Sequence, residues 1–155
     1  MTSVRIENQN PYGSLDKTKL HSFEASLGFR LPADYRKFLI EFNGGKPVPE
    51  FFWIIKNQDG TGVQQFYGLH DGPEPFSIDT YAGENRYGIP YGLLVIGDDG
   101  VGNYMCIGIN EDNFGKVFFL DHEVHPFHDL NSMEGVKKIA DSFDEFLGLL
   151  HPEDE

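Results

Sequence analysis

The stretch Leu27–Gly45, which reads LGFRLPADYRKFLIEFNGG, decides how the chain folds. Gly28 suits the left-handed conformation that ends a helix, and Pro32 suits the first turn of the next helix, where its missing N–H costs nothing. The stretch therefore predicts a helix, a sharp turn and a second helix. Asn43–Gly45 tolerates positive φ, so we expect the second helix to end there.

The two expected helices each have one apolar face. In the second helix the apolar residues recur at i, i+3, i+4 and i+7, and the first helix shows the same period after an N-cap at Thr18. Because the link between them is short, we expect a compact pair that covers a sheet. The apolar residues are Leu20, Phe23 and Leu27 in the first helix, and Tyr35, Phe38, Leu39 and Phe42 in the second.

The rest of the chain indicates strands followed by a last helix. Short aromatic and β-branched runs alternate with turn residues, which is typical of an antiparallel meander. We expect a hairpin from the first two runs and an amphipathic helix over Val136–Leu150. The predicted fold is a single α+β domain, residues 1–155, with a mostly antiparallel sheet of about five to six strands. The expected strands are Phe51–Ile55, Gln64–Leu69, Leu93–Ile96, Tyr104–Ile109 and Lys116–Leu120.

A set of residues at fixed spacing in the N-terminal third carries a family resemblance. These residues are Glu24, Leu27, Gly28, Leu31, Pro32, Tyr35, Arg36, Phe38, Leu39, Asn43, Gly44 and Gly45. The pattern resembles the SUKH superfamily, which contains the fungal Smi-one/Knr-four cell-wall regulators and many bacterial immunity proteins. Leu94–Ile109 and Ala140–Leu147 extend the likeness. The resemblance implies a binding module and not an enzyme. Many bacterial members are thought to neutralise a cognate toxin, often a nuclease, and no catalytic residue or cofactor comes with it.

The charge of the chain is strongly negative and unevenly distributed. The net charge is −13. Residues 1–75 hold eight Lys or Arg against nine Asp or Glu, a net −1, whereas residues 76–155 hold four against sixteen, a net −12. Such a field repels nucleic acid and steers a basic partner toward the C-terminal half. The alternative is that acidity only favours solubility.

The expected compartment is the cytoplasm. The single cysteine, Cys106, allows no intramolecular disulfide, and its strand pattern predicts a buried, inert thiol. No apolar run approaches the roughly 20 residues of a membrane-spanning helix. The first ten residues, MTSVRIENQN, are polar and do not resemble a signal peptide. We expect no membrane association and a monomer.

The strongest enzyme-like feature is Asp121–Asp129, DHEVHPFHD, in which His122, His125 and His128 recur every three residues among carboxylates. Imidazole and carboxylate are ligands that zinc accepts, so a metal-dependent hydrolase is one hypothesis for the function. Pro126 interrupts the helix that would bring them together. The favoured interpretation is therefore a polar loop with titrating imidazoles and no metal or other cofactor.

Two groups of side chains are predicted to contact a partner. The turn after Leu93–Ile96 holds an aspartate pair that does not match a calcium loop, and we expect its carboxylates to face a basic partner. The tyrosines on loops and the only tryptophan offer aromatic contact area, although each could instead pack in the core or seal the sheet edge. The candidates are Asp98, Asp99, Glu84 and Glu123, with Trp53, Tyr67, Tyr81 and Tyr91 as aromatic anchors.

These features predict a cytoplasmic immunity protein that binds a basic, nuclease-type toxin and blocks its active site. The alternative is an intracellular regulatory or scaffold protein, as in the fungal relatives. Basic patches interleaved with aromatic residues are lacking, which argues against nucleic-acid binding.

Overall fold

The structure, a computed structural model, describes residues 4–82 and 87–154. Its helices are α1 (Lys17–Leu27), α2 (Ala33–Phe42) and α3 (Phe143–Leu149), with two short 3-10 turns, η1 (Glu74–Phe76) and η2 (Ile78–Tyr81). Its strands are β1 (Arg5–Glu7), β2 (Lys46–Val48), β3 (Phe51–Ile55), β4 (Asp59–Gly62), β5 (Gln65–Phe66), β6 (Leu93–Asp98), β7 (Tyr104–Gly108), β8 (Val117–Leu120) and β9 (Val136–Ala140).

The predicted helix pair is confirmed, with one change at its start. Gly28 ends α1 with φ 87°, and α2 begins directly after Pro32. Asn43 ends α2 with φ 42°. The N-cap of α1 is Asp16 and not Thr18: a carboxylate oxygen of Asp16 accepts the Thr18 N–H at 2.8 Å. Thr18 therefore lies inside the first turn, where an orphan N–H needs an acceptor.

The predicted α+β architecture is confirmed. Strands β5 to β9 form one five-stranded sheet in chain order, with every neighbouring pair antiparallel. The apolar strand β6 lies inside this sheet and is buried along Leu93–Gly97. Cys106, on β7, is fully buried as expected, and burial raises the pKa of its thiol. Two small ribbons, β1–β2 and β3–β4, complete the described strands.

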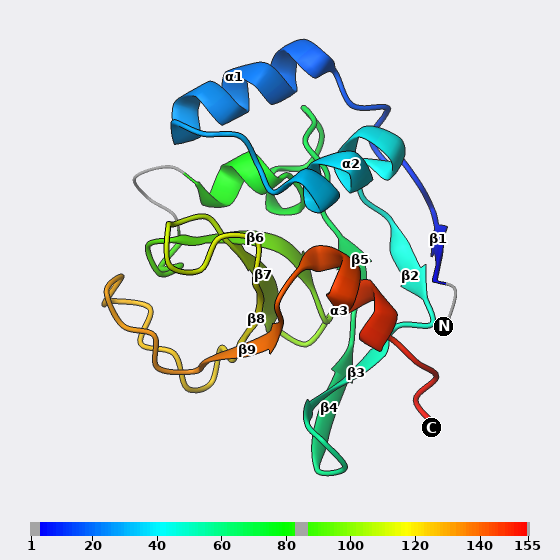
Figure 1. Ribbon diagram of the computed structural model, residues 1–155, viewed down its shortest axis with the longest axis vertical. Coiled ribbons are helices and arrows are strands. Elements are labelled where there is room, and N and C mark those ends of the chain that lie inside the picture. Colours follow the sequence, from blue (N-terminus) through cyan, green and yellow to red (C-terminus); the bar gives the residue numbers. More distant parts are fainter. Residues whose placement is uncertain (1–3, 83–86, 155) are drawn as a thin grey trace.

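The predicted hairpin between Phe51–Ile55 and Gln64–Leu69 is wrong. The chain turns back earlier, at Asn57 with φ 64°, so that β3 pairs with β4, whose sequence is only DGTG. Gln65–Phe66 instead pairs with β6. A glycine-rich strand has no β-propensity signal, because its pairing depends on backbone hydrogen bonds and not on its side chains. Figure 1 shows the β3–β4 hairpin projecting from the body of the protein.

The predicted helix over Val136–Leu150 is also wrong in its first half. Val136–Ala140 is a strand, β9, that pairs with β8 through Val136 and Leu120. The helix begins only after Ser142, whose hydroxyl accepts the Glu145 N–H at 3.0 Å. Ser at the N-cap with Glu three residues later is a known start signal for a helix. The five residues before it complete the sheet and do not join the helix.

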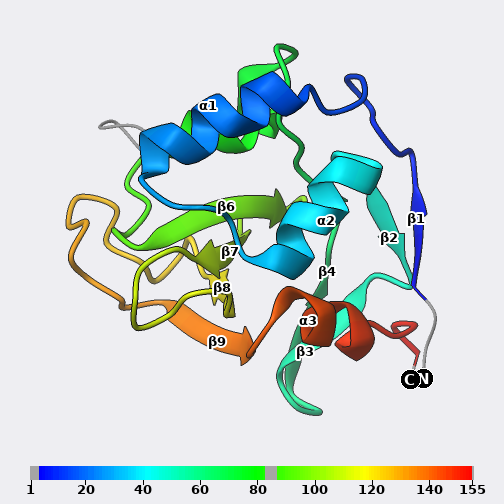
Figure 2. The same cartoon turned by 45° about the horizontal axis from the view of Figure 1, so that its top comes forward.

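The helices are joined to the sheet by an aromatic cluster around Phe143 of α3. Its ring centroid lies 5.2 Å from Tyr35 and 5.0 Å from Phe38 of α2, and 5.4 Å from Phe66 of β5. Figures 1 and 2 both show α2 and α3 side by side, with α1 lying over the segment that carries η1 and η2. Each buried aromatic ring contributes about 1.5–3 kcal/mol of transfer free energy. No helix among the described residues is long and apolar enough to cross a membrane.

Asn43 joins three segments that are distant in sequence. Its side-chain amide donates to the carbonyl oxygens of Gly13 at 3.0 Å and Leu69 at 3.1 Å, and its oxygen accepts the Leu69 N–H at 2.8 Å. The side chain is 1% exposed. These bonds satisfy backbone groups that would otherwise be buried without a partner.

Glu24 of α1 forms a buried ion pair with Arg36 of α2. One carboxylate oxygen lies 3.0 Å from the Arg36 Nε and also accepts the Leu31 N–H at 2.8 Å. Burial alone would raise the pKa of Glu24, but the hydrogen bonds from Arg36 and Leu31, with the charges of Arg36 and Arg30, outweigh it. The pKa of Glu24 is therefore lowered.

We expect Asn43→Ala to lower the free energy of unfolding by about 3–5 kcal/mol, because it removes three hydrogen bonds, two of them fully buried, and puts alanine at positive φ. Urea unfolding measures this. The matched control is Asn57→Ala, which also places alanine at positive φ but loses no side-chain hydrogen bond to another described residue; it should cost about 1 kcal/mol. Equal losses for the two variants would contradict the role of Asn43 as a joint.

We expect Glu24→Gln to lower the free energy of unfolding by about 1–2 kcal/mol at pH 7 and to flatten its pH dependence. The folded pKa of Glu24 lies below the unfolded value of about 4.3, so its contribution is complete above about pH 5 and is lost as pH falls through the folded pKa. Urea unfolding of wild type and variant between pH 7 and pH 3 tests this. Glu41→Gln, an exposed change on α2, should leave the pH profile unchanged.

Candidate functional site

The segment from His70 to Ala82 connects the sheet to the loop before β6 and holds no regular helix or strand. Pro73 and Pro75 cannot donate backbone hydrogen bonds, so the segment folds into the short turns η1 and η2. Ser77, between them, is extended with φ −111°. A segment of this kind needs side chains to satisfy its backbone groups.

His70 supplies part of that support. The residue is 8% exposed. Its ring Nδ1 lies 2.9 Å from the Gly72 backbone nitrogen, and its Nε2 lies 3.0 Å from the Phe76 carbonyl oxygen. Since Nδ1 accepts a hydrogen bond from the Gly72 N–H, the neutral ring carries its hydrogen on Nε2 and donates a hydrogen bond to the Phe76 carbonyl oxygen. Both ring nitrogens are thereby used to hold the segment.

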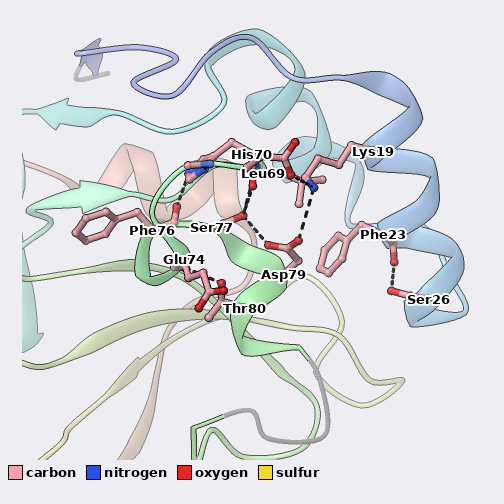
Figure 3. Close-up of polar contacts among 12 residues, drawn as sticks. Lys19, Phe23, Ser26, Leu69, His70, Glu74, Phe76, Ser77, Asp79 and Thr80 are labelled. Carbon is pink, nitrogen blue, oxygen red and sulfur yellow. Dashed lines mark hydrogen bonds and ion pairs between the residues drawn. The ribbon is translucent and has the colours of Figure 1, made fainter.

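Ser77 and Asp79 form the second support. The Ser77 hydroxyl lies 2.6 Å from a carboxylate oxygen of Asp79, and its oxygen also lies 3.3 Å from the His70 amide nitrogen. Ser77 is 2% exposed, so this arrangement is rigidly packed. Figure 3 shows the Asp79 carboxylate between Ser77 and Lys19.

Lys19 reaches this segment from α1. Its Nζ lies 2.8 Å from Asp71 and 4.0 Å from Asp79. The hydrogen bond from Lys19 lowers the pKa of Asp71, and the same bond raises the pKa of Lys19. A single ammonium group therefore lies against two carboxylates.

Two adjacent hollows, of about 460 Å³ each, meet at Asp79. The first, which we call the acidic hollow, is lined by Asp71, Glu74 and Asp79 together with His70, Ser77, Thr80, Gly72 and Tyr87. The second lies between α1 and the same segment, over Phe23 and Leu69. Asp71 and Glu74 are exposed on the rim of the acidic hollow, which therefore presents hydrogen-bond acceptors of negative charge.

The arrangement of Ser77, His70 and Asp79 is not that of a nucleophilic triad. Ser77 contacts the backbone of His70 and not its ring, and both ring nitrogens are engaged by other backbone groups. The imidazole therefore cannot take the serine proton, as nucleophilic catalysis would require. The chemistry of the acidic hollow suits binding of a cation or a basic side chain.

The two predicted aspartates on the turn after β6 have different surroundings. Asp99 is 8% exposed, and its carboxylate accepts hydrogen bonds from the Val101 N–H, the Asn103 N–H and side chain, and the Thr61 hydroxyl. Asp98 is half-buried and accepts the Tyr67 hydroxyl proton at 2.6 Å. Both carboxylates stabilise the turn, because each already accepts hydrogen bonds from other residues of the chain.

The three predicted histidines do not come together. His122 lies 2.6 Å from the Asn103 side-chain oxygen, and His128 is exposed elsewhere on the loop. His125 is 4% exposed, and its two ring nitrogens face the carbonyl oxygens of Glu134 and Gly88. Within residues 4–82 and 87–154, no three His, Cys, Asp or Glu side chains are placed to hold a metal ion.

The remaining predicted contact residues divide between surface and interior. Tyr67 and Tyr81 are buried, 3% and 5% exposed, and their ring centroids lie 5.9 Å apart in a stacked pair. They therefore belong to the core beneath the surface. Trp53 is half-buried, with its ring edge-on to Phe51. The exposed candidates are Tyr91 and Glu123, and Glu84 lies outside the described residues.

Sequence reasoning missed the acidic hollow. The segment DGPEPFSID shows its signal, since Asp71, Glu74 and Asp79 fall among prolines and a glycine, where carboxylates on a loop are accessible. The contribution of Lys19 had no local signal, because it is 52 residues from Asp71 in sequence.

We expect Asp99→Ala to lower the free energy of unfolding by about 3 kcal/mol, because four hydrogen-bond donors lose a buried acceptor. Thermal or urea unfolding measures this. Asp112→Ala removes the same charge from an exposed turn and should change stability by less than about 0.5 kcal/mol. An unchanged free energy of unfolding in Asp99→Ala would contradict the role of this carboxylate in holding the turn.

The chain matches a protein-family profile and a bacterial protein. The profile described as the SMI1/KNR4 family (SUKH-1) matches residues 14–148. The chain is also 32% identical to the "SPbeta prophage-derived uncharacterized protein YokK" of Bacillus subtilis (strain 168), over 83% of this chain and 71% of that protein. The matched region contains the helix pair with its Glu24–Arg36 ion pair, the five-stranded sheet and the acidic hollow. The chain therefore belongs to the SMI1/KNR4 family (SUKH-1).

Proposed function

We propose that the protein is an immunity protein that acts in the cytoplasm, where it binds and neutralises a basic cognate toxin through the acidic hollow. The observation that carries the proposal is the set of three carboxylates, Asp71, Glu74 and Asp79, around one hollow. Membership of a family that includes immunity proteins supports it.

The charges of the acidic hollow favour a basic partner. Lys19 lies against Asp71 and Asp79, and no salt bridge between Glu74 and a described residue occurs. A lysine or arginine of the toxin would add to this set, and arginine would do so with two parallel hydrogen bonds. The net charge of −13 would speed the encounter.

Aromatic side chains beside the acidic hollow would add apolar contact. Tyr87 lines it and is 63% exposed. Tyr12 is 41% exposed, and its ring lies 4.5 Å from the His70 ring and stacks on Phe76 at 6.3 Å. Interfaces often centre on tyrosines that are held rigidly beside polar groups. Tyr91 and Glu123, both exposed, remain predicted contacts of a wider interface.

Neutralisation would follow from occupation of the toxin's own basic site. A nuclease binds phosphate with lysine and arginine, and an acidic surface that pairs with these groups excludes the substrate. The alternative function is a regulatory or scaffold protein, which the fungal members of the family favour. The two differ in the partner that they predict.

We expect tagged protein to retain a basic toxin domain from its native cytoplasm at low salt and to release it as salt rises, because exposed charge pairs are screened. The triple variant Asp71→Asn, Glu74→Gln, Asp79→Asn should weaken binding of the identified partner about 10- to 100-fold. Mass spectrometry identifies the partner, and calorimetry with the purified pair measures affinity.

The matched control neutralises three exposed carboxylates elsewhere, with Glu111→Gln, Asp112→Asn and Glu153→Gln, and should bind nearly as wild type. Circular dichroism confirms that both triple variants are folded. Equal weakening by the two variants would reject the acidic hollow as the contact. An acidic or regulatory partner held regardless of salt would reject the immunity function and favour the scaffold.

A further inference from the structure

The outward face of α2 borders a third hollow, of about 520 Å³, between this helix and the turn at 110–115. Arg36, Lys37 and Ile40 line it from α2, on the side of the helix away from the buried Tyr35 and Phe38. We call it the α2 groove. It shares no lining residue with the acidic hollow.

The charges of the α2 groove are opposite to those of the acidic hollow. Arg30, Arg36 and Lys37 line it, and no carboxylate does. Among the described residues, neither Arg30 nor Lys37 has a salt bridge, and Arg36 uses only its Nε to bind Glu24. The terminal amino groups of Arg36 therefore have no hydrogen-bond acceptor within the part of the chain that the structure describes. In a chain of net charge −13, this is a local excess of cations.

The floor of the α2 groove is apolar and rigid. Leu31 lies at its base, and Ile40 and Phe114 are 41% and 46% exposed. Phe114 is held edge-on against Phe29, with ring centroids 5.9 Å apart. The turn that carries it is packed on Pro32: a Cβ at Gly115 would lie 3.7 Å from the Pro32 Cβ. Exposed apolar side chains that are fixed in place and ringed by polar groups mark interaction sites.

We infer that the α2 groove is a docking surface for an acidic, apolar segment of a partner protein. The carboxylates of that segment pair with Arg30, Arg36 and Lys37, and its apolar side chains cover Ile40 and Phe114. Charge complementarity selects this partner, since a basic segment would place like charges together. It also disfavours a second copy, because two chains of charge −13 repel each other.

This surface is separate from the proposed toxin contact and does not depend on it. A protein with an acidic hollow and a cationic, apolar groove can hold two partners of opposite charge. The inference stands if the basic partner proves not to be a toxin.

The test uses two fluorescein-labelled helical peptides of about 14 residues, four turns long. The acidic probe carries leucines along one face and glutamates elsewhere, and the basic probe has lysine in place of each glutamate. Fluorescence anisotropy with the full chain should show binding of the acidic probe at least about tenfold tighter than of the basic one, weakening as salt rises.

Two variants locate the binding site, each with a matched control. Lys37→Glu and Phe114→Ala should each weaken the acidic probe about tenfold. Lys56→Glu, on the exposed β3–β4 hairpin, and Val101→Ala, 68% exposed on the β6–β7 turn, should leave the affinity unchanged. All four positions are exposed, so the variants are expected to fold, which circular dichroism verifies.

Three outcomes overturn the inference. The first is equal affinity for the two probes, or no binding of the acidic probe. The second is equal weakening by Lys56→Glu and Lys37→Glu, and the third is a dimer, detected by sedimentation, that Phe114→Ala dissociates. The last would assign the groove to a second copy of the chain.

Discussion

The buried carboxylate of Glu24 fixes α1 against α2, and both surfaces of the protein depend on that angle. It binds the Arg36 side chain and the Leu31 N–H, and so holds the sharp turn between the helices from within. α1 then brings Lys19 against Asp71 and Asp79 of the acidic hollow, and α2 turns Arg36 and Lys37 toward the α2 groove. One ion pair thus positions cations that serve two separate surfaces. A charge pair this well buried also needs its partners, since either alone would be costly.

Although the net charge is strongly negative, carboxylates and cations are segregated into two separate sites, the acidic hollow and the α2 groove. Two carboxylates of the acidic hollow are held in place before any partner binds: Asp79 by the Ser77 hydroxyl and Asp71 by Lys19. The cations of the α2 groove surround a rigid apolar floor that includes Phe114. Preorganised charge lowers the entropy lost on binding, which is a general route to affinity from a modest surface. Fixed charge and fixed shape together make both sites suited to recognition.

Parts of the candidate site could be foreseen, and others could not. Loop carboxylates such as Asp71 and Glu74 are visible beside prolines, because a segment without regular structure exposes its side chains. The burial of Asp99 was not visible, because its donors include Thr61, which only the β3–β4 pairing brings near. The histidines that recur every three residues, His122, His125 and His128, separate in space, since the chain through them follows turns and not a helix.

The sequence by itself determined the helix pair, its turn at Gly28 and its end at Asn43, and the strands of the meander from β6 to β8. Periodicity and the φ preferences of single residues act locally, so they can be seen along the chain. Only the tertiary structure decided that DGTG is a strand, that Val136–Ala140 joins the sheet, and that Lys19 meets Asp71. Such pairings depend on backbone hydrogen bonds and charges between segments distant in sequence, for which no local pattern exists.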